Sequence, residues 1–163
     1  MTTKPWTART VEDFLLEQYS RTHAGRLYVE VPIGGPGGSG QWPGGCTIRR
    51  LDGVLFLTSE AASIHRYHAA APIFEADLRR FSPELIEVKA SLNRTAIGQA
   101  IAGRRMFERQ YGVVPRRTVI LCRTSDAALA WVCEQEGIEV TSVGSNPPMQ
   151  PAAGSAAAER PSR

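Results

Sequence analysis

A glutamate and a lysine stand two residues apart in the apolar segment Leu85-Ile86-Glu87-Val88-Lys89. Side chains alternate along a strand, so Glu87 and Lys89 are expected to leave the same face. Such a pair is an ordinary surface ion pair unless a second acid is brought to the same place. Asp52, which lies in an apolar segment upstream, is placed by the sequence to be that acid. The candidate site is therefore Asp52, Glu87 and Lys89.

Two carboxylates and a lysine suit the hydrolysis of a phosphodiester. That reaction needs a divalent cation to hold a non-bridging oxygen and to lower the pKa of an attacking water. Mg²⁺ typically takes one or two carboxylates and keeps several waters. Asp52 and Glu87 would bind Mg²⁺, or Mn²⁺ in its place, with the carbonyl of Val88 as a third ligand. Lys89 would orient or deprotonate the water and offset charge on the phosphorane.

The elements that must position these groups alternate between helices and strands. The periodicity predicts helices over 10–24, 95–111 and 127–136, and strands over 27–33, 46–59, 84–90, 118–122 and 138–143. Residues 60–83 are an insertion, with a short helix expected over 74–81. The first three strands can pair as an antiparallel meander, whereas the later crossover helices demand parallel partners. The predicted fold class is α/β, a mixed central sheet flanked by helices.

Length and composition set the boundaries of this fold. The 163 residues suffice for about one domain, assigned to residues 1–145. Residues 146–163, rich in Pro, Ala and Ser, are expected to be a disordered tail. The chain has no apolar signal region and no run near the ~20 residues that span a bilayer. With three cysteines that lack CxxC spacing, these features predict a reduced, cytoplasmic protein without membrane association.

The formal charge of +3 is mild, but its distribution is uneven. Seven arginines lie between residues 94 and 123, after the glutamate–lysine strand, most of them on one helix and the next strand. A polyanion could use that cluster, and a solvated helix face is the alternative. The candidates for binding nucleic acid are Arg94, Arg104, Arg105 and Arg109.

These motifs together resemble the PD-(D/E)XK nuclease superfamily over roughly residues 10–143. The resemblance rests on Asp52 before Gly53 and an apolar strand, on Glu87-Val88-Lys89, and on the helix with Gln99. It implies a restriction-endonuclease-like α-β-β-β-α-β core and metal-dependent cleavage of DNA. In the implied site Asp52 and Glu87 bind metal, Lys89 is catalytic, and Gln99 supports them.

The chain also departs from the superfamily pattern. Leu51 precedes Asp52 where proline is common, and Gly103 stands four residues after Gln99, where RecB-type exonucleases have tyrosine. The second departure argues against the RecB subfamily alone. A further acid of the site, Glu17 or Glu30, is left open, since an exposed surface acid is the alternative for each.

Two other motifs favour simpler interpretations. The loop Gly34–Gly40 lacks the Gly-Lys-Ser/Thr ending of a phosphate loop and is expected to be a flexible connection that could touch substrate. His65 and His68 have no third ligand at zinc-site spacing. Two rivals to the nuclease remain, a catalytically inactive nucleic-acid-binding or assembly module with the same fold, and an unrelated α/β domain with a surface ion pair. The sequence leaves open the shape of the DNA, endo or exo cleavage, and a homodimer or specificity partner.

Overall fold

The computed structural model describes residues 6–35 and 42–144. The predicted tail over 146–163, and most of the glycine-rich loop, lie outside these ranges. These described residues form four helices and six strands in the order α1 (Val11–Thr22), β1 (Gly25–Ile33), β2 (Arg49–Leu57), β3 (Ser63–Arg66), α2 (Tyr67–Leu78), β4 (Glu84–Val88), α3 (Arg94–Tyr111), β5 (Arg117–Cys122), α4 (Ala127–Gln135) and β6 (Ile138–Ser142). Within the described residues, no helix is both long and apolar enough to cross a membrane.

The six strands form one mixed sheet in the order β3-β1-β2-β4-β5-β6. β2 runs antiparallel to β1 and to β4, while β5 runs parallel to β4 and β6. The predicted mixed sheet of an α/β fold is thereby confirmed, including its antiparallel first half and parallel second half. The insertion differs from the prediction because it contributes an edge strand, β3, parallel to β1, and its helix begins at Tyr67.

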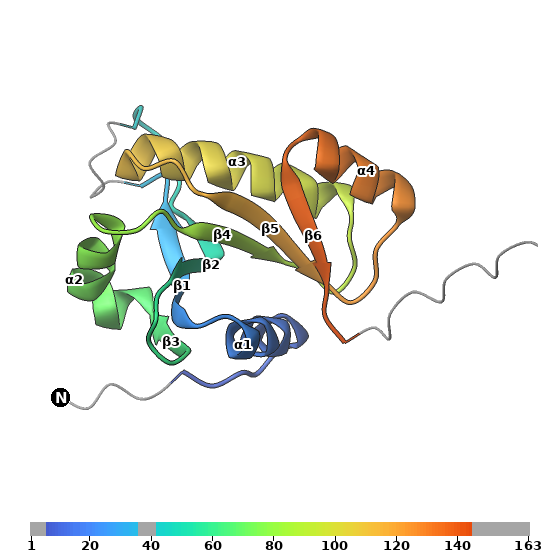
Figure 1. The fold of residues 1–163 in the computed structure, drawn as a ribbon. Coiled ribbons are helices and arrows are strands. Elements are labelled where there is room, and N and C mark those ends of the chain that lie inside the picture. Colours follow the sequence, from blue (N-terminus) through green and yellow to red (C-terminus); the bar gives the residue numbers. More distant parts are fainter. Residues whose placement is uncertain (1–5, 36–41, 145–163) are drawn as a thin grey trace, which may run out of the picture.

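Helices cover both faces of the sheet (Figure 1). Leu15 and Leu16 of α1 pack on one face against Ile86 and Val88 of β4. α2 and α3 cover the other face, where Phe74 and Phe107 are completely buried, and α4 extends this layer over β5 and β6. β4 thus lies in the middle of the protein, with its side chains divided between the two layers.

The pleat of β1 is interrupted at Glu30, which has a left-handed φ of 61°. The sequence predicts that Leu27, Val29, Val31 and Ile33 share one face. Instead, Leu27 and Val29 pack under α1, whereas Val31 and Ile33 pack on the opposite side with α3. A left-handed residue turns the strand over, and this residue occupies the ladder position opposite Asp52, between the pairs Val29–Gly53 and Val31–Leu51. The distortion therefore adjoins the candidate site.

Candidate active site

The site forms where β2 and β4 separate. Their backbone pairing runs from Leu55–Glu84 to Gly53–Ile86 and continues no further. Beyond that point the Asp52 carboxylate, in place of a backbone carbonyl, links β2 to β4. Its Oδ2 accepts a hydrogen bond of 2.8 Å from the backbone N–H of Val88. This contact fixes Asp52 against the strand that carries the other two candidate residues.

Gly53 permits the close packing beside Asp52. A Cβ added there would lie 3.0 Å from Leu27 Cδ1, 3.2 Å from Leu16 Cδ2 and 3.3 Å from Ile86 Cβ. A side chain would push α1 or β1 away from the sheet centre. The Asp-Gly pair thus has a packing reason as well as a chemical one.

Lys89 brings three carboxylates together. Its Nζ lies 2.9 Å from Glu87 Oε1, 4.0 Å from Asp52 Oδ2 and 4.0 Å from Glu12 Oε1. The same ammonium donates a 3.0 Å hydrogen bond to the carbonyl of Val88, so that carbonyl also faces the site. The sequence-predicted residues Asp52, Glu87 and Lys89 do converge.

Burial and the mutual charges of these groups shift the pKa values of Glu87, Asp52 and Lys89. Glu87 is 7% exposed, and burial together with the charge of Asp52 raises its pKa to about 7 despite the ion pair with Lys89. Burial also raises the pKa of Asp52, against the opposing effects of the Val88 N–H and of Lys89. Burial by itself would lower the pKa of Lys89, but Glu87 and Asp52 raise it, which keeps the side chain an ammonium. The buried Glu87 and the Asp52 side chain, which is 35% exposed, thus share one cation.

The donor set fits a hard divalent ion. Asp52 and Glu87 supply two carboxylates, and the Val88 carbonyl lies beside them. Across residues 6–35 and 42–144, no three His, Cys, Asp or Glu side chains are grouped tightly enough to hold a metal. Mg²⁺ is commonly held by one or two carboxylates and retains several waters, so two acids and a carbonyl match its requirements better than those of zinc.

Two grooves meet at these residues. One, of about 510 Å³, is lined by Glu87, by Gln99 on α3, and by Arg49 and Arg50 at the start of β2. The other, of about 320 Å³, is lined by Asp52 and by Glu12, and shares Arg50 with the first. Gln99 is therefore placed as predicted, on the wall of the groove that reaches Glu87. Arg50 reaches both grooves, and the sequence interpretation overlooked it.

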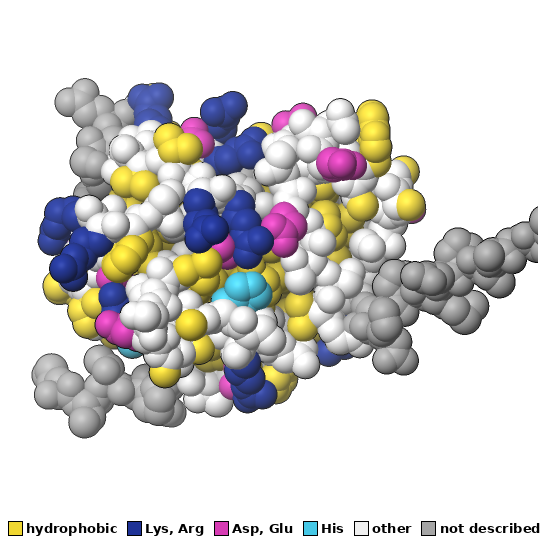
Figure 2. Space-filling view, viewed as in Figure 1, with side chains coloured by type: hydrophobic (Ala, Val, Ile, Leu, Met, Phe, Trp, Pro, Cys, Tyr) yellow, Lys and Arg dark blue, Asp and Glu magenta, His cyan; other side chains and the backbone are white. Residues whose placement is uncertain are grey.

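The predicted arginine cluster is divided by the fold. Arg104 donates a 3.0 Å hydrogen bond to the Glu136 carbonyl at the end of α4, which ties two helices together. Arg105 is exposed and pairs with Glu108 on its own helix, Arg109 lies over the Trp42 ring, and Arg94 is exposed in the first turn of α3. Figure 2 shows basic side chains over α3 and the start of β5 with acidic groups among them. These four arginines do not line the two grooves.

A third acid, Glu12, approaches Lys89, and Glu30 lines the same groove as Asp52 and Glu12. Glu17 pairs with Arg21 one turn along α1, and Glu30 accepts a 2.8 Å hydrogen bond from Arg66. Glu12 lies in the first turn of α1, directly after the Thr10 cap, where acidic residues are common for helix-dipole reasons. Because that explanation already accounts for Glu12 in the sequence, its approach to Lys89 was not predicted. Only the packing of α1 across the sheet places it there.

Comparisons of this chain with family models, with curated proteins and with solved structures found no match.

Proposed function

We propose that this protein is a metal-dependent deoxyribonuclease that hydrolyses the phosphodiester bonds of DNA. Its active site would be formed by Asp52, Glu87 and Lys89. The observation that carries the proposal is the meeting of a buried carboxylate, a partly buried carboxylate and an ammonium at the point where β2 and β4 separate. The element order supports it, since one helix, three antiparallel strands, a helix and a parallel strand match the core that the PD-(D/E)XK resemblance implies. β3 and α2 are then an insertion within that core.

The side chains divide the chemistry among them. Asp52, Glu87 and the Val88 carbonyl would hold Mg²⁺ or Mn²⁺. When bound, the ion would supply charge stabilisation at the phosphate and a lower pKa for the attacking water. The water loses a proton and its oxygen bonds to phosphorus, while the ester P–O bond breaks and the departing oxygen gains a proton. Lys89, as an ammonium, would orient the water and offset the developing negative charge.

The surroundings of the site suit a long polyanion. Arg49 and Arg50 are exposed and line the larger of the two grooves together with Gln99 on α3. Arginines in this position would contact phosphates and hold DNA without selecting its sequence. Arg94, Arg105 and Arg109 are proposed to extend this contact along α3, whereas Arg104 has mainly a structural role.

The decisive experiment compares Asp52→Asn with the wild-type protein. Asparagine retains an oxygen for the Val88 N–H but removes the charge that would bind metal. Because even indirect partners of a metal site contribute about 10- to 100-fold, loss of a ligand should slow cleavage by at least about 100-fold. Supercoiled, linear, branched and single-stranded DNA are incubated with Mg²⁺ or Mn²⁺, and EDTA should abolish all cleavage.

Asp126→Asn is the matched control, because Asp126 caps α4 by accepting from Leu129 N and asparagine caps equally well. It should cleave like the wild type. A wild-type protein that leaves every substrate intact, or an Asp52→Asn variant as active as the wild type, would overturn the proposal. DNA binding without cleavage would favour the catalytically inactive binding module.

A further inference from the structure

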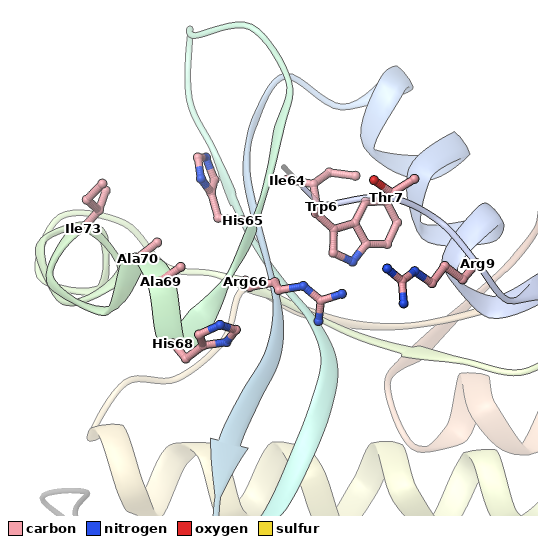
Figure 3. A pocket seen from close by; sticks show the side chains of 10 residues that line it. All are labelled: Trp6, Thr7, Arg9, Ile64, His65, Arg66, His68, Ala69, Ala70 and Ile73. Carbon is pink, nitrogen blue, oxygen red and sulfur yellow. The ribbon is translucent and has the colours of Figure 1, made fainter. Parts of the chain in front are cut away.

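A second pocket adjoins the candidate active site. It has a volume of about 650 Å³ and lies between the segment before α1, strand β3 and the start of α2. Its lining includes Trp6, Arg9, Arg66 and His68, and none of the described residues that line it is acidic (Figure 3). We call it the Trp6 pocket.

The Trp6 pocket lies next to the groove that Asp52 lines. Trp6 and Arg66 line both this pocket and the groove that holds Asp52 and Glu12. The two grooves in turn share Arg50 and Leu51, so Gln99, Glu87, Asp52 and the Trp6 pocket belong to three neighbouring hollows.

The lining combines an aromatic surface with positive charge. Trp6 is half-buried and packs against the apolar core under α1, which fixes its indole in place. Arg9 and Arg66 point toward one another beside that indole (Figure 3). Arg66 is partly neutralised by Glu30 at 2.8 Å, whereas Arg9 forms no ion pair with any described residue. Positive charge remains available next to the ring.

A stacking surface beside guanidinium groups is the combination that binds unpaired nucleotides. Bases inside a duplex are already stacked on both neighbours, so an internal nucleotide must leave the duplex before its base can offer a face to Trp6. On the basis of the proposed nuclease function, we propose that the Trp6 pocket binds one unpaired nucleotide of DNA, with its base on Trp6 and its phosphate at Arg9 and Arg66. The preferred substrate is then a duplex with a single-stranded arm, cut near the junction.

The test measures binding separately from cleavage. A dye-labelled duplex with a short single-stranded arm and its blunt counterpart are titrated by fluorescence anisotropy in Ca²⁺, a larger ion than Mg²⁺ that is expected to support binding with little cutting. Wild-type protein should prefer the armed duplex. Trp6→Leu keeps apolar volume against the core and removes the stacking face. It should weaken binding to the armed duplex roughly 5- to 150-fold, the size of one base–aromatic stack.

Arg9→Ala provides a second variant that removes no packed apolar ring, and it should reduce the same preference. Trp131→Ala is the matched control, since Trp131 is 62% exposed on α4, away from both grooves. Equal binding of the two duplexes by wild type, or a preference that survives both Trp6→Leu and Arg9→Ala, would overturn the inference. Wild type that cleaves both duplexes in Mg²⁺ but binds them equally would support the nuclease and refute the nucleotide-binding role of the Trp6 pocket. A Trp6-dependent preference without any cleavage would support that role of the pocket and refute the nuclease.

Discussion

Replacing Lys89 by methionine tests whether the carboxylates around it act as one electrostatic unit. Methionine retains most of the alkyl chain, so little packing is lost. The ammonium lies 2.9 Å from Glu87 and 4.0 Å from both Asp52 and Glu12. A unit-charge pair 4 Å apart is worth about 4 kcal/mol at an effective dielectric of 20, from which desolvation and the 24% exposure of Lys89 subtract. We expect the free energy of unfolding at pH 8 in EDTA to fall by about 2–3 kcal/mol.

Urea denaturation with and without Mg²⁺ provides the measurement. Mg²⁺ should stabilise Lys89→Met more than the wild type, because the ion replaces the missing positive charge among the acids. The difference between the two proteins should narrow at pH 5, below the raised pKa of about 7 at Glu87, since a neutral carboxyl needs no counter-charge. Arg105→Met, which removes an exposed helix pair, should cost less than about 0.5 kcal/mol. Unchanged stability of Lys89→Met in EDTA, or an identical response to Mg²⁺, would refute the reasoning.

Two further changes test the framework around the site. Asp77 is buried, which by itself would raise its pKa, but hydrogen bonds from Arg26 and Tyr28 lower it. The stabilisation that ionised Asp77 gives the folded state should be present above about pH 4 and lost as the pH falls through its lowered pKa. Urea denaturation should therefore show a free energy of unfolding about 2–4 kcal/mol lower for Asp77→Asn than for the wild type at pH 7, and a much smaller difference at pH 2. At Glu30, where φ is 61°, the free energy of unfolding of Glu30→Gly should be about 1 kcal/mol higher than that of Glu30→Ala, because only glycine adopts that conformation freely. Equal thermal stability of the two variants would contradict the backbone strain at this position.

Patterns of short range in the sequence were sufficient for much of this protein. The alternation of β4 alone places Glu87 and Lys89 on one side and Val88 on the other, because side chains along a strand alternate with a period of two. The helix predicted from residue 10 onward does begin there, with Thr10 as its cap and a capping box between Thr10 and Asp13. The order of helices and strands, with the chain rules for antiparallel and parallel pairing, then predicted the mixed sheet correctly.

Tertiary contacts decided the remaining features. The left-handed Glu30 turns β1 over, so the simple alternation of its apolar residues wrongly placed Val31 and Ile33 on the same face as Leu27 and Val29. Glu12 reaches Lys89 only because α1 packs across the sheet, and Arg104 is occupied by α4 rather than by the grooves. Periodicity reports which way a side chain leaves its own element. Which partner it meets there depends on how elements distant in sequence pack against each other. Patterns within a short stretch of sequence do not encode that packing.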